Sequence, residues 1–255
     1  METTVTVGAD KVWAEDSGGG RPVVILLHPG VGDAHIWDDM WPALTSRCRV
    51  IRYDVRGYGR SPAATEDYTL LGDLLQVMEH FQVTAAHVVG CSMGGGAAME
   101  LALTAPERVI SLTLLCPGVD GYQAPEEPEL TARWKALREA NDEDGLVVFY
   151  QQLMAAAGAE PEVLEQLYSA VRAEANELRF KKQGEPIFDR LHEVSTPTVL
   201  LVGDADTPWI VTCDEEIARR IPGCRFVKVP GGDHMLPMRT PELLAAAVLD
   251  QVSGS

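Results

Sequence analysis

The sequence predicts an α/β fold, with a mostly parallel central sheet, helices on both faces of that sheet and a helical insertion. Short apolar runs without polar alternation recur along the chain, and such runs are typical of strands buried on both faces of a parallel sheet. Stretches with helical periodicity separate these runs, and most runs end in a loop rich in Gly, Pro or Asp. The 255 residues suffice for one large core, so we expect one domain with an insertion.

The amino-terminal part predicts two short strands and then the first strand of the parallel sheet. Segments 4–7 and 11–14 flank a turn, and 22–27 is a continuous apolar run. That run leads into the glycine-rich loop 28–32, at the position where open α/β sheets bind their ligands. Two tryptophans four residues apart then predict one amphipathic helix over 36–44.

The strand and helix pattern then repeats. Strand 49–53 ends in a turn-rich loop, and the periodicity of 68–81 predicts a helix that leads into the next strand at 86–89. The helix after that strand ends just before Pro106, because proline restricts the residue that precedes it. Another buried strand is predicted over 109–116.

The alternation stops between residues 119 and 190, where the sequence predicts three or four helices and no strand. An insertion of this size is tolerated best in a loop at the carboxyl ends of the strands, where it covers the ligand site as a lid. The predicted organisation is therefore a core of residues 1–118 and 191–255, with a helical lid of residues 119–190 inserted into it.

The carboxyl-terminal part resumes the core pattern. Strands are predicted over 198–202 and 225–229, and a helix is predicted over 214–221. A final helix is predicted over 241–252, with Thr240 as its N-cap and a proline at its first position.

The turn around Ser92 has the pattern of a nucleophile on a sharp connection from strand to helix. It reads Gly-Cys-Ser-Met-Gly over 90–94, between an apolar strand and a helix of small residues. So tight a turn strains its central residue, and glycines two places to either side let the strand and the helix pass closely. Ser92 is then exposed, and the free backbone N–H of Met93 points to where an oxyanion forms.

A serine, an aspartate and a histidine stand at the ends of three separate predicted strands: Ser92, Asp206 and His234. Their order along the chain is that of α/β hydrolases and differs from the order in other serine hydrolases. With the motifs around them, the chain resembles the α/β-hydrolase superfamily over nearly its whole length, in particular the lid-bearing branch of esterases, lactonases and cofactor-free haloperoxidases. The motifs that carry the resemblance lie at 27–30, 54–61, 90–96, 203–206 and 232–234.

The resemblance implies a role for each of these residues. Ser92 is the expected nucleophile, His234 the base, and Asp206 the carboxylate that orients the imidazole. The expected oxyanion-hole donors are the backbone N–H groups of Gly30 and Met93.

Two positions depart from the usual pattern of the family. Pro29 stands where relatives usually have glycine, which removes one backbone donor but leaves the N–H of Gly30. Asp233 stands where relatives often have glycine, and the sequence leaves open whether its carboxylate affects His234.

Several neighbouring residues have competing interpretations. Asp204 is the alternative acid, but the spacing of the motif favours Asp206. His28 is interpreted as a structural histidine that bonds its loop, and Cys91 as a small buried residue. Trp209 lies just past the acid and is the residue that we expect to bind substrate.

Composition restricts the classes of partner. The formal net charge of −17 argues against nucleic acid and anionic membranes as partners. Five cysteines without C-x-x-C spacing indicate neither a disulfide framework nor a zinc site, and we expect no metal and no cofactor. The amino terminus lacks a signal-peptide pattern, and no uncharged apolar run reaches the ~18 residues of a membrane helix, so a cytoplasmic protein is expected. Nothing in the sequence indicates the oligomeric state.

The patterns together predict a serine-dependent hydrolase that cleaves a carboxylic ester or lactone through an acyl-enzyme. A carbon–carbon hydrolase, a thioesterase or a cofactor-free haloperoxidase is an alternative on the same triad, because one oxyanion hole serves all of these reactions. A receptor or signalling protein of the same fold, with little turnover, is a second alternative. The negative charge and the apolar lid favour a small, neutral, hydrophobic acyl substrate.

Overall fold

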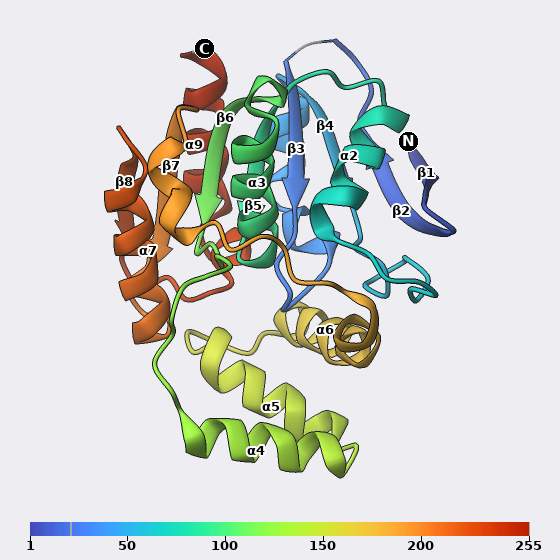
Figure 1. Cartoon of the computed structure of the whole chain (residues 1–255), viewed down its shortest axis with the longest axis vertical. Coiled ribbons are helices and arrows are strands. Elements are labelled where there is room, and N and C mark those ends of the chain that lie inside the picture. Colours follow the sequence, from blue (N-terminus) through green and yellow to red (C-terminus); the bar gives the residue numbers. More distant parts are fainter. Residues whose placement is uncertain (21, 255) are drawn as a thin grey trace.

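The computed structural model describes residues 1–20 and 22–254, and it has the predicted α/β fold around one mostly parallel sheet (Figure 1). The strands are β1 (Glu2–Val7), β2 (Asp10–Asp16), β3 (Val23–Leu27), β4 (Arg49–Tyr53), β5 (Ala86–Cys91), β6 (Val109–Leu115), β7 (Thr198–Gly203) and β8 (Arg225–Val229). Their order in the sheet is β1-β2-β4-β3-β5-β6-β7-β8. β2 pairs antiparallel with β1 and with β4, and all other neighbouring strands pair in parallel.

Helices cover both faces of the sheet, which is why its central strands are apolar throughout. All residues of β3, β5 and β7 are buried. Helices α2 (Leu70–His80) and α3 (Met93–Thr104) pack together on one face, and Figure 1 shows α9 (Pro241–Ser253) behind the strands. The short helix α1 (Trp41–Thr45) contacts α9 and β4, and α7 (Pro208–Arg220) packs on β7 and β8.

Between β6 and β7 the chain forms α4 (Pro128–Glu139), α5 (Glu143–Met154), α6 (Pro161–Phe180) and the 3-10 helix η3 (Phe188–Glu193). Apart from one bridge between Lys181 and Tyr68, residues 119–190 are helices and loops. Figure 1 shows β3 and β6 pointing toward this insertion, with α6 nearest to the sheet and α4 farthest from it. The insertion therefore stands over the carboxyl ends of the parallel strands.

The structure corrects the predicted helix over 36–44. A 3-10 helix, η1 (Ala34–Trp37), comes first, and α1 begins separately at Trp41. The side chain of Asp33 accepts a hydrogen bond from the backbone N–H of His35 and so starts η1 two residues before the predicted start. Pro42 lies in the first turn of α1, where its missing N–H costs nothing, and so marks a second helix start.

Two further boundaries near the carboxyl terminus differ from the prediction. Helix α7 begins at Pro208 and not at Asp214, because a proline at the first helical position favours an early start. A short helix, α8 (Leu236–Arg239), was not predicted. Thr240 holds the N-cap position of α9, but its hydroxyl donates to the carbonyl of Leu236 and does not cap that helix.

All five cysteines are free thiols. Among the residues that the structure describes, no helix combines the length and the apolar character that crossing a membrane requires.

Candidate active site

Ser92 occupies a strained turn between β5 and α3. Its φ is +48° and its ψ is −113°, a conformation that non-glycine residues rarely adopt. The backbone on both sides holds it there, because its N–H donates to the carbonyl of Leu115 at 2.9 Å and its own carbonyl accepts from Gly96 and Gly118. The turn presents the Ser92 side chain at the carboxyl end of the sheet, next to the amino terminus of α3.

The glycines on either side of Ser92 are required by close backbone approach. A Cβ on Gly90 would lie 2.4 Å from the carbonyl oxygen of Gly94. A Cβ on Gly94 would lie 2.3 Å from the carbonyl oxygen of Leu27 in the neighbouring strand. No side chain fits at either position unless the strand and the helix separate.

We therefore expect Gly94→Ala to lower the free energy of unfolding by about 2 kcal/mol or more. Alanine gains at most about 1 kcal/mol of helix propensity over glycine, which is less than the cost of an overlap with backbone. Urea unfolding measures the difference. Gly20→Ala is the control, because among the described residues nothing lies within 4 Å of its Cβ position. Equal stability of Gly94→Ala and Gly20→Ala would contradict the steric argument.

Asp206 and His234 form a buried pair in the loops that follow β7 and β8. Nδ1 of His234 lies 2.8 Å from Oδ2 of Asp206, and both side chains are almost fully buried. Oδ1 of Asp206 accepts a hydrogen bond from the N–H of Thr207 at 2.7 Å. Because Nδ1 is engaged by Asp206, Nε2 of His234 is left for Ser92, and both residues line the same cavities.

The two competing carboxylates point elsewhere. Asp204 is exposed, and its Oδ1 accepts from the N–H of Gly231 at 2.6 Å. Asp233 is buried, but its carboxylate pairs with Arg239 and accepts from the N–H groups of Met235 and Ala157. The sequence left open whether the carboxylate of Asp233 affects His234. In the structure that carboxylate is paired with Arg239 and not with the histidine.

Gly30 and Met93 both line the cavity that contains Ser92. The loop of Gly30 is held by the buried His28, whose Nε2 accepts from the N–H of Val55 at 2.9 Å and whose Nδ1 lies 2.8 Å from the carbonyl of Pro29. One ring thus connects the loop of Gly30 to the loop that follows β4. His28 therefore has the expected structural role.

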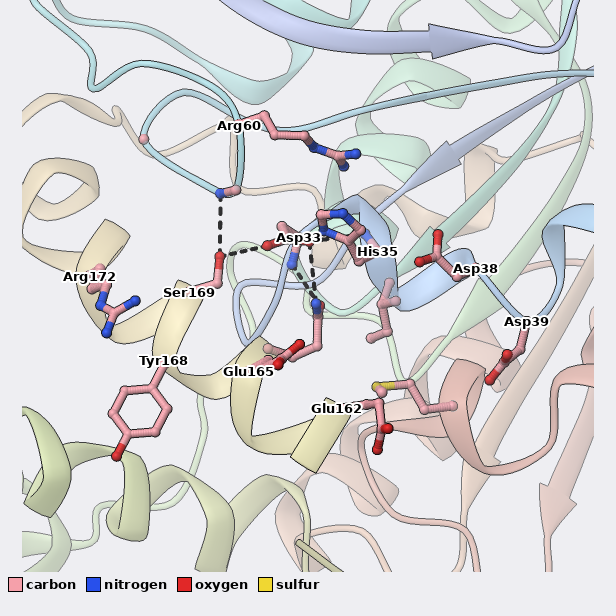
Figure 2. Close-up of a pocket in the computed structure, with 15 residues that line it drawn as sticks. Asp33, His35, Asp38, Asp39, Arg60, Glu162, Glu165, Tyr168, Ser169 and Arg172 are labelled. Carbon is pink, nitrogen blue, oxygen red and sulfur yellow. Dashed lines mark hydrogen bonds and ion pairs between the residues drawn. The ribbon is translucent and has the colours of Figure 1, made fainter. Parts of the chain in front are cut away.

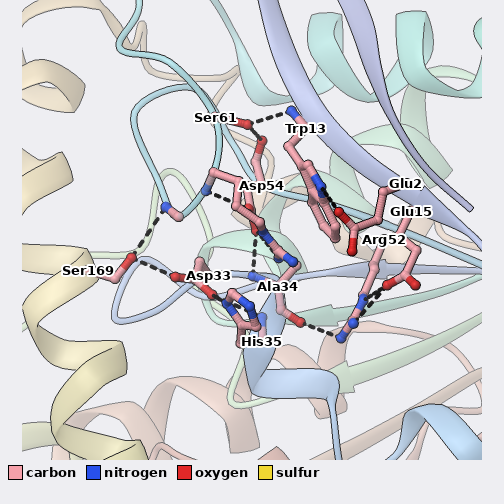
Figure 3. Close-up of polar contacts among 12 residues, drawn as sticks. Glu2, Trp13, Glu15, Asp33, Ala34, His35, Arg52, Asp54, Ser61 and Ser169 are labelled. Atoms are coloured by element: carbon pink, nitrogen blue, oxygen red, sulfur yellow. Dashed lines mark hydrogen bonds and ion pairs between the residues drawn. The ribbon is translucent and has the colours of Figure 1, made fainter.

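The loop after β4 supports the same region from the other side (Figure 3). Oδ1 of Asp54 accepts from the N–H of Ala34 at 2.8 Å, and Oδ2 accepts from the backbone and the guanidinium of Arg60. The hydroxyl of Ser61 donates to the carbonyl of Asp54 and accepts from the N–H of Trp13. The motif at 54–61 is therefore a scaffold for the loop that follows β3.

Helix α6 of the insertion is bonded to that loop at Asp33 (Figures 2 and 3). Gln166 accepts from the N–H of Asp33 at 2.9 Å, and the Ser169 hydroxyl donates to its carboxylate at 2.7 Å. Burial alone would raise the pKa of Asp33, but hydrogen bonds from His35 and Ser169 outweigh it and hold the pKa well below its usual range. The anchoring carboxylate thus stays charged.

Two adjoining cavities meet at Ser92 and His234, and they differ in polarity. One, of about 270 Å³, is mostly apolar and includes Tyr122, Met154 and Trp209 in its wall. The other, of about 500 Å³, also contains charged side chains, namely Glu100, Asp120, Glu177, Lys181 and Lys182. Sequence reasoning missed these charged residues, because no motif distinguishes Glu100 of α3, or the other four in the insertion, from the many exposed charges of the chain.

A larger cavity of about 770 Å³ lies between η1 and α6 (Figure 2). Among the described residues that line it, none is Ser92, Asp206 or His234. We therefore place the candidate active site in the two smaller cavities.

Cys116 also lies near the buried pair. Ligand atoms of Cys116, Asp206 and His234 lie within 4.8 Å of one another, which is a possible arrangement for metal ligands. Nδ1 of His234 is already bonded to Oδ2 of Asp206 at 2.8 Å, so these two atoms form a hydrogen-bonded pair with Cys116 beside it.

Asp214 of α7 is a second buried acid in this region. Neither of its carboxyl oxygens has a hydrogen-bond partner among the described residues. Burial, and then the nearby Asp206, raise the pKa of Asp214 well above its usual value. Asp214 therefore lies close to the pair, whereas Nδ1 of His234 is bonded to Asp206.

Comparison with known proteins identifies the family of the chain. Residues 24–247 match the model of the alpha/beta hydrolase family. The chain is 30% identical to rhodomycin D methylesterase DnrP of Streptomyces peucetius, with 93% of each chain covered. It is 28% identical to a protein of Caulobacter sp. strain K31 provisionally named carbamate hydrolase RutD, over 96% of this chain and 97% of that one.

Among solved structures, the chain is similar to a thermophilic esterase from Thermogutta terrifontis. The two share 25% identity and superpose with a TM-score of 0.78, over 100% of this chain and 98% of the esterase.

Proposed function

Because the chain belongs to the alpha/beta hydrolase family and is a hydrolase, we propose that it cleaves a carboxylic ester or lactone through an acyl-enzyme on Ser92. The observation that carries the proposal is the buried pair of Asp206 and His234, whose histidine lines one cavity together with Ser92, Gly30 and Met93. No metal or cofactor takes part in the proposed mechanism.

In this mechanism His234 accepts the hydroxyl proton of Ser92 as the serine oxygen attacks the substrate carbonyl. The backbone N–H groups of Gly30 and Met93 donate to the oxyanion that forms. His234 then passes its proton to the departing alcohol, which leaves the acyl group on Ser92. A water molecule, deprotonated by His234, attacks the acyl-enzyme, and the acid and Ser92 are released. Asp206 keeps the imidazole in the required tautomer throughout.

The insertion is proposed to act as a lid, and Trp209 to contact the substrate in the apolar cavity. A water-excluding cover and an apolar cavity of about 270 Å³ suit a small or medium hydrophobic group. The net charge of −17 disfavours polyanionic ligands at long range. Two of the similar proteins are named as an esterase and a methylesterase, which supports an ester bond as the target.

We expect kcat/KM for a neutral short-chain ester to exceed that for the matched acyl-coenzyme A. Coenzyme A carries several negative charges, and the acidic protein repels it at low ionic strength. A panel of p-nitrophenyl esters, lactones, carbamates and acyl-coenzyme A compounds tests this, with Ser92→Ala as the control for non-enzymatic hydrolysis. A higher kcat/KM for the thioester would overturn the substrate assignment, and a carbamate preference would move it toward the chemistry for which the Caulobacter protein is named.

A further inference from the structure

Gly30 and Met93, the two residues proposed to form the oxyanion hole, are packed against each other and against Tyr58. The Sδ atom of Met93 and the hydroxyl of Tyr58 each lie 3.8 Å from the position that a Cβ on Gly30 would take. The same hydroxyl is 3.5 Å from the carbonyl oxygen of Gly30. A displacement of Tyr58 or of the Met93 side chain would therefore move the loop that carries one of the two donors.

Helix α6 closes this group into a ring. The Tyr58 hydroxyl donates to the carboxylate of Glu177, and the ammonium of Lys181 pairs with the same carboxylate. The Nζ atom of Lys181 in turn lies 3.7 Å from Sδ of Met93. The ring thus runs from Gly30 through Tyr58, Glu177 and Lys181 to Met93, and Glu177 and Lys181 lie at the carboxyl end of α6.

The charges of Glu177 and Lys181 affect how well the oxyanion hole stabilises a negative charge. Glu177 and Lys181 line the cavity that contains Ser92 and are mostly buried, so solvent screens them less than a surface pair. A bare carboxylate at this position would oppose negative charge that develops beside Gly30 and Met93. Burial, with Glu177 next in effect, raises the pKa of Tyr58 well above its ordinary value, so Tyr58 remains a neutral donor and Lys181 is the cation that balances Glu177.

We propose that Lys181 is a positioning residue for the oxyanion hole: it neutralises Glu177 and packs on Met93, so that helix α6 completes the hole from outside the core. The inference rests on the proposed function of Ser92. The proposed role differs from that of an ion pair that only stabilises the helix. Removing Lys181 should lower the rate because the carboxylate of Glu177 is then left uncompensated.

The test is a double-mutant cycle on an ester substrate. Lys181→Met should lower kcat about tenfold and change KM less than about twofold. The uncompensated carboxylate of Glu177 destabilises the negatively charged transition state and has little effect on the binding of a neutral substrate. Glu177→Gln should lower kcat by a smaller factor than Lys181→Met, because glutamine still accepts from Tyr58 and leaves no uncompensated carboxylate. The double variant should recover most of the lost kcat, since it leaves no unpaired charge.

A trifluoromethyl ketone gives a second readout that a structural role would not move. It forms an anionic adduct on the serine, and its affinity should fall in Lys181→Met by the same factor as kcat/KM. Lys135→Met is the matched control, because Lys135 is exposed on α4. It should leave both quantities unchanged.

In the kinetic experiments, three results would overturn the proposal: a wild-type kcat in Lys181→Met, losses that simply add in the double variant, or a loss in Lys181→Arg as large as that in Lys181→Met. The arginine variant also covers the case in which Lys181→Met does not fold, as judged by its thermal transition. Fluorophosphonate labelling distinguishes a failure of the proposed function from a failure of this inference. An unlabelled wild type contradicts the proposed function, whereas equal labelling rates in wild type and Lys181→Met contradict the role of Lys181 alone.

Discussion

Replacing Ser92 by alanine should abolish labelling of the protein by a fluorophosphonate and lower kcat about 10⁴-fold or more. The strained turn places Ser92 in the wall of both cavities, together with His234. Without the serine hydroxyl no acyl-enzyme can form, and only the oxyanion hole and binding remain to accelerate hydrolysis. Mass spectrometry of the labelled wild type should locate the adduct on Ser92.

Ser46→Ala is a suitable control for this experiment, because Ser46 is exposed at the end of α1 and bonds only within its own turn. Its labelling and turnover should equal those of the wild type. Labelling that persists in Ser92→Ala would show that another residue is the nucleophile.

Replacing Asp206 by asparagine should lower kcat roughly 10⁴-fold. The amide presents an N–H where the carboxylate accepted one, which favours the tautomer of His234 whose Nε2 carries the proton and is unable to act as a base. KM should change little, because Asp206 is buried behind the histidine. Steady-state kinetics and a urea unfolding curve separate the catalytic loss from a loss of stability.

Asp204→Asn is the matched control, two residues away with the same change in charge. Asp204 is exposed and accepts one hydrogen bond from the backbone of Gly231, which the carbonyl of asparagine preserves. Its activity should stay within about twofold of the wild type. If Asp204→Asn were the damaging change and Asp206→Asn the mild one, the acid would be Asp204 and the loop would adopt a different path in solution.

Most of the core was predictable because its signals are local. The buried strands are short apolar runs, so periodicity located β3, β5 and β7 within a residue or two. In a parallel sheet the carboxyl ends of the strands share one edge, so chain order alone indicated that the loops with Ser92, Asp206 and His234 lie near one another. The close bond between Asp206 and His234 follows from that topology.

Helix boundaries were predicted less accurately where two local signals compete. Helical spacing of Trp37 and Trp41 predicted one helix, but capping by Asp33 and the position of Pro42 divide it into η1 and α1. The hydrogen bond of the Asp33 side chain depends on the path of its loop, which Asp54 and α6 hold in place. A spacing pattern contains no information about such contacts.

The sequence by itself determined the α/β core and the residue types at the ends of its strands, because strands buried on two faces and tight turns each require a local pattern of residue types. Only the tertiary structure decided what surrounds them. Asp233 stands beside His234 in the chain, yet Arg239 and the backbone of Ala157 take up its carboxylate. Lys181 is far from Met93 in the chain, yet its Nζ atom lies against Sδ of Met93 while it pairs with Glu177. Contacts between distant segments depend on how α6 packs over the sheet, and no local pattern in the sequence specifies that packing.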